Sequence, residues 1–315
     1  MSPERAPQST AAHMAHAGWS ASLPGSAVGV HIGGTVCLAA ASFDDALFWR
    51  GALPPGGVES SVAEIVEAVR SVSSSPRYVV LGTPGHVDRA GRTVTGASNL
   101  GPEWKGTVPL ADLLRERLQC EVTIRNDAEV ALEAEKRRGG LVAVNDGALI
   151  TLSNGVGVAL LVNGEERPTE LGHSVVQMDG PACAGRPHRG CYETYLGGWA
   201  LPQRYRERHP GFKGTAARDI PNDEAFWTEC GTVLGQLVVT LCLMGQPLQA
   251  VSFIGAVSLT RAQFLLPAVI ARVQQEAALV VTMPRRLTVT PLGEDVGVIG
   301  ALIMARDLAN PFRPD

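Results

Sequence analysis

The chain has 315 residues and a mass of 33.2 kDa, enough for two domains of about 150 residues each. Hydrophobic residues make up 45% and charged residues 18% of the sequence, which is typical of a globular protein with a large core. The net charge of −4 and the pI near 6.0 give no electrostatic reason to expect a nucleic-acid partner. We see no uncharged apolar stretch of about 18 residues that would predict a membrane span.

Residues 1–26 are rich in Ala, Ser, Pro and His and have no apolar periodicity, so we expect a disordered tail. The tail lacks the basic start and apolar run of a signal peptide, and it is too short for a winged-helix DNA-binding domain. Six cysteines fit a reducing cytoplasm, where we expect the protein to reside. Four lie in apolar surroundings and are interpreted as buried thiols: Cys37, Cys120, Cys230 and Cys242.

The first ordered stretch, residues 27–41 (AVGVHIGGTVCLAAA), predicts a buried strand, a glycine-rich turn and a second strand. Gly33, Gly34 and Thr35 in that turn would let backbone amides approach an anion, with the threonine hydroxyl as an extra donor. A tight hairpin turn without a ligand explains the same residues. The motif alone therefore leaves both interpretations open.

The chain then alternates between helices and strands. We expect a helix over 60–73, a strand over 77–82, a helix over 110–119, and a strand over 121–125 that leads into a helix ending at Arg138. That last helix begins at Asn126-Asp127, and an aspartate at this position is commonly only an N-cap.

A second half repeats the pattern, with strands over 148–153 and 156–162 forming a hairpin around Asn154-Gly155. The later predicted elements are a helix over 192–207, a polar loop over 208–221, a helix over 223–245, a strand over 250–254, a helix over 260–278 that starts or kinks near Pro267, a strand over 286–290 and a helix over 296–308. Two such halves predict a duplicated architecture with the ligand between them.

Residues 170–193 (ELGHSVVQMDGPACAGRPHRGCYE) concentrate carboxylates, imidazoles and thiols in an otherwise ordinary α/β sequence. Such groups cost free energy when they leave water, so a dense group of them needs a ligand, a metal or each other as partners.

The ordered set of motifs resembles the ROK family of sugar kinases and related repressors. The matching segments, in order over nearly all of residues 27–305, are HIGGT at 31–35, GTPGHVD at 82–88, SNLGPEW at 98–104, ND at 126–127, SNGVG at 153–157, ELGH at 170–173, GCYE at 190–193 and GVIGA at 297–301.

This resemblance implies an α/β chain with the two-domain actin-like ATPase/hexokinase (ribonuclease H-like) fold and an interdomain cleft. The implied division is an N-terminal α/β domain at 27–125, a C-terminal α/β domain with a zinc loop at 126–296, and a C-terminal helical segment at 297–315 that packs back on the first domain. A homodimer is the oligomer that the resemblance suggests.

By motif match, the sugar ligands would be Asn99, Asn126, Asp127, Glu170, His173 and Glu193. Asp127 would be the general base that takes a proton from the attacking hydroxyl. The residues that would contact the nucleotide are Gly33, Gly34, Thr35, Asn154, Gly155 and Gly255.

Four departures from the family pattern fall on the nucleotide side. The acid that begins the first phosphate motif and handles hydrated magnesium is replaced by His31. The usual Gly-Thr-Gly turn reads Ser153-Asn154-Gly155, the glycine-rich segment before Glu170 is short, and a run of glycines near the adenosine reads Ile254-Gly255-Ala256.

The family's cysteine-rich loop and E-x-G-H histidine form a tetrahedral zinc site. One cysteine of that loop is missing here and the spacing is stretched, so we expect His188 to complete a set with His173, Cys183 and Cys191. A metal-free loop, in which His173 only contacts sugar, is the main alternative. A disulfide between Cys183 and Cys191 is less favoured in the cytoplasm.

The sequence therefore predicts a Mg-ATP-dependent kinase of a hexose or hexose-like sugar. The complete sugar set favours this activity. The alternatives are a sugar-binding sensor without kinase activity, favoured by His31, and other acid/base chemistry on a sugar derivative by Asp127, Glu170 and Glu193. A small sugar is the expected partner, with neither nucleic acid nor membrane.

Overall fold

The computed structural model describes residues 26–34, 36–43, 47–54, 57–184, 186–244, 248–276 and 283–310. The predicted tail lies outside the described residues except for Ser26, whose carbonyl accepts hydrogen bonds from the Arg77 and Tyr78 amides.

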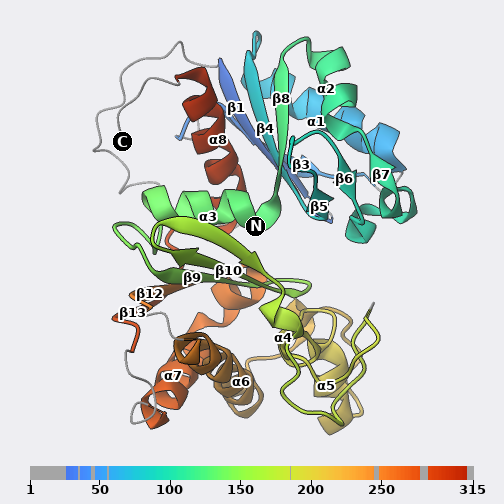
Figure 1. The fold of residues 1–315 in the computed structure, drawn as a ribbon. Coiled ribbons are helices and arrows are strands. Elements are labelled where there is room, and N and C mark those ends of the chain that lie inside the picture. Colours follow the sequence, from blue (N-terminus) through green and yellow to red (C-terminus); the bar gives the residue numbers. More distant parts are fainter. Residues whose placement is uncertain are drawn as a thin grey trace, which may run out of the picture.

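The upper half of the molecule in Figure 1 is built on a five-stranded sheet of order β3-β2-β1-β4-β8. Its strands are β1 (Ala27–Ile32), β2 (Val36–Ala40), β3 (Phe48–Ala52), β4 (Tyr78–Thr83) and β8 (Glu121–Asn126). Pairing is antiparallel from β1 through β2 to β3, and parallel from β1 through β4 to β8. Helices α1 (Gly57–Val72) and α2 (Leu110–Leu118) pack on one face through their apolar stripes.

The lower half contains a second five-stranded sheet, of order β11-β10-β9-β12-β13. Its strands are β9 (Gly147–Leu152), β10 (Val156–Val162), β11 (Glu165–Thr169), β12 (Ala250–Ile254) and β13 (Arg286–Val289). Pairing is antiparallel from β9 through β10 to β11 and parallel from β9 through β12 to β13, as in the first sheet. The shared order and sense confirm the predicted duplication.

Helix α3 (Asp127–Arg138) lies between the two halves, and α8 (Val296–Ala309) lies beside the first sheet in the upper half (Figure 1). Val130 of α3 packs with Ala301 of α8 and Val80 of β4, whereas Leu132 of α3 packs with Leu149 of β9. Thus α3 contacts both halves, and α8 packs on the first sheet. The residue boundaries of the two domains stay a prediction.

Several further elements are short. They are β5 (His86–Val87), β6 (Val94–Thr95) and β7 (Thr107–Val108), which form a small third sheet, the 3₁₀ turns Ser98–Leu100, Pro102–Lys105, Leu171–His173, Ala217–Asp219 and Gly293–Asp295, and the helices α4 (Tyr192–Leu196) and α5 (Leu201–Arg208). Short strands of two residues carry no periodic signal, so the sequence did not predict the third sheet.

The prediction of one helix over 192–207 is wrong, because α4 and α5 are separate. Gly197 adopts an extended backbone with ψ of 137° and ends α4. The Gly198 amide donates to the Ser153 carbonyl at 2.8 Å, and a Cβ at Gly198 would lie 2.5 Å from that oxygen. The break therefore lets the chain approach the turn between β9 and β10 closely.

The helix predicted over 260–278 is α7 (Ala256–Gln275), which starts earlier and contains Pro267 in its interior. Gly255 precedes it with φ of +91°, a conformation that favours glycine, and a Cβ there would lie 2.3 Å from the Leu152 carbonyl oxygen. The close contact between Gly255 and β9 thus determines the residue at which α7 begins.

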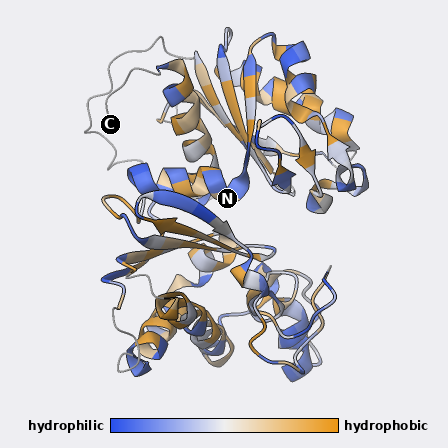
Figure 2. Cartoon of the chain, in the orientation of Figure 1, coloured by the Kyte–Doolittle hydropathy of each residue, from blue (hydrophilic) through white to orange (hydrophobic). Residues whose placement is uncertain are grey.

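Helix α6 (Glu224–Leu243) and α7 are both long and apolar enough to cross a membrane by length and composition alone. They pack against each other below the second sheet, and α6 contributes Trp227 and Leu234 to the core of this half (Figures 1 and 2). Core helices of globular proteins pass the same test, so this is weak evidence for a membrane span.

Replacing Gly300 with alanine is expected to destabilise the fold by about 3 kcal/mol or more, because overpacking against backbone cannot relax by a rotamer change. A Cβ at this α8 position would lie 1.7 Å from the Val130 carbonyl oxygen of α3. Urea unfolding would measure the loss. Gly106→Ala is the matched control, since a Cβ there meets nothing within 4 Å, and an equal loss in both variants would contradict the close approach.

Candidate functional site

The start of α3 carries two of the predicted site residues. Asn126 is the N-cap: its Oδ1 accepts from the Ala128 amide at 2.9 Å, and its Nδ2 donates to the Gly85 carbonyl at 2.8 Å. Asn126 therefore joins the helix to the loop after β4. Because Asn126 performs the capping, Asp127 is the first helical residue rather than the cap.

Asp127 is half-buried, and its Oδ1 accepts from the Ala128 amide at 2.9 Å. Burial raises the pKa of Asp127 to about 6, although its backbone hydrogen bonds act in the opposite direction. A carboxylate with a pKa near 6 is mostly ionised at neutral pH and still basic enough to accept a proton. This pKa is compatible with the predicted role of Asp127 as a general base, which stays a prediction.

Glu170 and His173 follow β11 in a single 3₁₀ turn. Glu170 is exposed, and its Oε2 lies 4.0 Å from His173 Nε2. The same oxygen accepts a hydrogen bond of 2.7 Å from the Arg186 guanidinium. Arg186 was not predicted, and its only signal in the sequence is the stretched spacing between Cys183 and His188.

Glu193, in the first turn of α4, reaches the turn between β9 and β10. Its Oε2 accepts from the Val156 amide at 3.0 Å, and its Oε1 accepts from Trp199 Nε1 at 3.3 Å. A Cβ at Gly155 would lie 2.5 Å from Glu193 Oε2, so glycine is needed there for this contact. Trp199 was also not predicted, because its position depends on the break between α4 and α5.

Asn99 is exposed on the 3₁₀ turn Ser98–Leu100, and its carbonyl oxygen would lie 3.1 Å from a Cβ at Gly34. The structure therefore brings Asn99 to the first glycine turn. Of the predicted sugar ligands, Asn99, Asn126 and Asp127 belong to segments around the first sheet, and Glu170, His173 and Glu193 to the second half. Their role as a sugar site stays a prediction.

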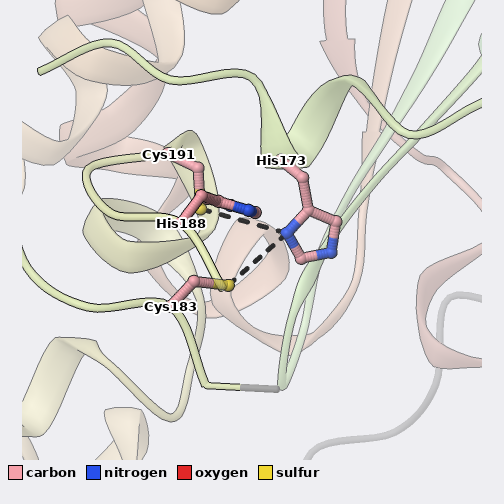
Figure 3. Close-up of side chains that lie close together, drawn as sticks. All are labelled: His173, Cys183, His188 and Cys191. Carbon is pink, nitrogen blue, oxygen red and sulfur yellow. Dashed lines mark hydrogen bonds between the residues drawn. The ribbon is translucent and has the colours of Figure 1, made fainter. Parts of the chain in front are cut away.

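The four predicted metal ligands come together in the structure (Figure 3). His173 Nδ1 lies 3.6 Å from Cys183 Sγ and 3.9 Å from Cys191 Sγ. The His188 ring stands edge-on to the His173 ring, with centroids 5.5 Å apart. All four ligand atoms lie within 4.8 Å of one another.

This cluster fits zinc. Tetrahedral zinc with bonds of about 2.0–2.3 Å separates its ligand atoms by about 3.3–3.8 Å, close to the two sulfur–nitrogen distances observed. His188 Nε2 is buried and has no hydrogen-bond partner among the described residues, which is costly for a polar atom unless it binds an ion. All six cysteines in the described chain are free, including Cys183 and Cys191.

The predicted nucleotide turns use part of their own backbone for structure. The Gly33 amide donates to the Val36 carbonyl at 2.9 Å, as in the tight hairpin turn that was the alternative interpretation. The Ser153 amide donates to the Gly155 carbonyl at 3.1 Å in the turn that contains Asn154. Thr35 lies outside the described residues.

His31 packs where β1 meets the start of α8. A Cβ at Gly297 would lie 2.6 Å from His31 Nδ1, and a Cβ at Gly82 would lie 3.4 Å from the same atom. This nitrogen is buried and has no hydrogen-bond partner in the described part of the chain. Burial lowers the pKa of His31 to about 4, so the ring is neutral at physiological pH.

A neutral imidazole does not fit magnesium, which prefers oxygen ligands and negative charge. His31 therefore supplies no anchor for a hydrated magnesium ion at the position where the family has an acid.

Stability is expected to depend on pH through His31. In the unfolded chain His31 binds a proton below its ordinary pKa of 6.5, whereas in the folded chain it does so only near pH 4. The contribution of neutral His31 to the free energy of unfolding is therefore fully present above pH 6.5 and is lost as the pH falls. Between pH 7 and pH 5 this loss is about 2 kcal/mol. Urea unfolding of wild type and His31→Asn at both pH values would measure it.

Asp127 titrates in the same range with the opposite sign, because its raised pKa makes the folded state bind the proton first. The wild-type pH profile alone thus understates the His31 effect, and the difference between wild type and His31→Asn isolates it. A difference that does not change between the two pH values would contradict a neutral, buried His31.

A family model described as the ROK family matches residues 28–308 of the chain. A glucokinase from Thermotoga maritima is 31% identical over 192 residues, which is 57% of this chain and 60% of the length of that enzyme. The chain thus spans less than two thirds of this curated relative.

Among solved structures, a ROK family glucokinase from Streptomyces griseus in complex with glucose and AMPPNP has a TM-score of 0.75 and 25% identity, covering 89% of this chain and 99% of that one. A ROK family transcriptional regulator, a homologue of the E. coli MLC protein, has a TM-score of 0.73 at 15% identity over 89% of this chain and 78% of its own, and shows the fold alone. These similarities confirm the predicted hexokinase-type fold.

Proposed function

Because the chain belongs to the ROK family, we propose that it phosphorylates a hexose or hexose-like sugar with Asp127 as the general base. The observation that carries the proposal is the environment of Asp127. Its carboxylate is half-buried at the start of α3 with a pKa of about 6, next to Asn126, which is held in place by Gly85 and the helix amide.

In this mechanism the Asp127 carboxylate accepts the proton of the attacking sugar hydroxyl. The hydroxyl oxygen forms a bond to the terminal phosphorus of a nucleoside triphosphate, the bond from that phosphorus to the bridging oxygen breaks, and a nucleoside diphosphate leaves. The first step needs the ionised base, so kcat/KM is expected to fall as the pH drops below about 6.

The other predicted sugar ligands suit a sugar by their chemistry. Carboxylate and amide groups of Asn99, Glu170 and Glu193 accept and donate hydrogen bonds to hydroxyls, and a wrong epimer would leave some of them unpaired. Arg186 keeps Glu170 paired with a positive charge before a ligand binds. The single hydrogen bond leaves capacity on the carboxylate for a hydroxyl donor.

Zinc, held by His173, Cys183, His188 and Cys191, would have a structural role. Four protein ligands close a tetrahedral site and leave no open position for a substrate, so the ion would supply only cross-linking of the loop. His173 Nε2, on the far side of the ring from the sulfurs, would still face Glu170.

Sugar binding without phosphoryl transfer is the second candidate, and His31 is the observation that favours it. A buried neutral ring in place of an acid weakens the case for magnesium and for a nucleotide. In either role we propose a small sugar as the partner, a cytoplasmic location that suits six free cysteines, and a homodimer.

Calorimetry with a panel of hexoses, with and without magnesium and ATP, tests both candidates when ADP release is followed in parallel. A measurable heat of sugar binding, with neither ATP binding nor turnover, would rule out the kinase activity and support sugar binding without phosphoryl transfer. His31→Asp restores a carboxylate at the first turn, so a gain of turnover in that variant would identify His31 as the change that limits nucleotide use.

A further inference from the structure

A cavity of about 400 Å³ lies between α5 and the loop segments that contain Pro181 and Arg189. Pro181, Ala182 and Arg189 form one wall, where Ala182 and Arg189 pair as an antiparallel bridge. Gln203 and Glu207 of α5 form another. The volume falls in the range of about 300–1,000 Å³ that is usual for small-ligand sites. None of the predicted sugar ligands lines this cavity.

The lining combines an aromatic side chain with exposed polar side chains. Trp199 is half-buried and borders the cavity, whereas Gln203 and Glu207 are exposed and offer both donors and acceptors. An indole face stacks favourably on the C–H face of a sugar ring, and rim groups of this kind bond its hydroxyls.

The charges favour a neutral ligand. Arg204 is buried beneath the cavity, and its guanidinium already donates to the Tyr195 carbonyl at 2.5 Å and to Glu229 at 2.6 Å. Arg189 donates through Nε to the Gly180 carbonyl, and the Glu207 carboxylate opposes its charge in the lining. An anionic ligand would therefore meet Arg204, which is already paired, Arg189, which already donates one hydrogen bond, and the negative charge of Glu207.

Trp199 connects this cavity to the candidate sugar site. Its ring borders the cavity, and its Nε1 donates to Glu193 Oε1 at 3.3 Å. The other oxygen of Glu193 accepts from the Val156 amide at 3.0 Å. A ligand that stacks on Trp199 would thus restrict the indole that orients Glu193.

We propose that this cavity is a second binding site for a neutral saccharide, coupled to the candidate sugar site through Trp199 and Glu193. The saccharide site stands on the cavity itself, and only the coupling rests on the proposed function.

Calorimetry on the full-length protein would measure the binding of a panel of neutral saccharides: glucose, mannose, N-acetylglucosamine, maltose and sucrose. The blocking variant is Gln203→Tyr, which adds bulk to the rim without removing a contact of the core, and the matched control is Arg206→Tyr on the same helix outside the lining. We expect at least one panel member to bind wild type and the control alike and to bind Gln203→Tyr about tenfold more weakly or worse. Equal binding to all three proteins, with Glu207→Ala also unchanged, would overturn the proposal.

Trp199→Phe tests the coupling, because it keeps an aromatic face and removes the donor to Glu193. It should retain second-site binding and abolish any effect of that ligand on KM at the first site. If glucuronate bound more tightly than glucose at the site that Gln203→Tyr blocks, the cavity would not be selective for a neutral ligand and this part of the proposal would be overturned. Saccharide binding in the cavity without any turnover would reject the kinase activity and keep the second site. Turnover that Gln203→Tyr does not affect, together with a single binding event, would keep the kinase activity and reject the second site.

Discussion

Asp127→Asn is expected to lower kcat for sugar phosphorylation by about 10³-fold, because a positioned general base contributes about 10²–10⁴-fold to proton transfer. The amide is isosteric and keeps an oxygen that can accept from the Ala128 amide, so α3 should still start at the same residue. Sugar affinity should change far less than kcat, since only the proton acceptor is lost. Steady-state kinetics with calorimetry on the same samples would separate the two effects.

The matched control is Glu129→Gln, the same carboxylate-to-amide change in the first turn of α3. It alters the charge near the helix start but not the proposed base, and its kcat should stay within a few-fold of wild type. The acid limb of kcat/KM near pH 6 should persist in this control. Equal kcat in Asp127→Asn and wild type would contradict the role of Asp127.

Cys191→Ser is expected to abolish stoichiometric zinc binding and to lower the thermal midpoint by about 10 °C. A metal that binds only the folded state at about 1,000 times its Kd stabilises by about 4 kcal/mol, and each kcal/mol shifts the midpoint by about 2–4 °C in domains of this size. Cys191 is fully buried at the N-cap of α4, which carries Glu193, so the loss should also weaken sugar binding. Metal analysis and calorimetric melting would measure these effects.

Cys242→Ser on α6 is the control, because that thiol is also buried but lies outside the cluster. It should keep its zinc. His188→Ala distinguishes four ligands from three: we expect loss of zinc, since His188 Nε2 lies in the cluster and is buried with no hydrogen-bond partner among the described residues. Wild-type protein that contains no zinc after purification with zinc present would contradict the site.

Much of the fold could be predicted from local pattern. Buried strands followed by glycine turns at 27–41 and 148–162 indicated the duplication, and both sheets confirm it. The metal ligands followed instead from the resemblance to the ROK family, with His188 in place of the missing cysteine, and the structure brings the four side chains together. Element boundaries near glycines were less accurate: Gly197 and Gly255 end or begin helices because of contacts with β9 and the turn after it.

By itself, the sequence determined the α/β class, the repeated pattern of strand, glycine turn and strand, and the set of polar residues, because hydrophobic periodicity and motif order depend on neighbours along the chain. Only the tertiary structure decided what those residues experience. Burial beside Gly297 makes His31 neutral, and burial raises the pKa of Asp127 at the start of α3. Arg186 on Glu170 and Trp199 on Glu193 are contacts between segments, and desolvation and hydrogen bonding across such contacts follow from packing, which no local pattern encodes.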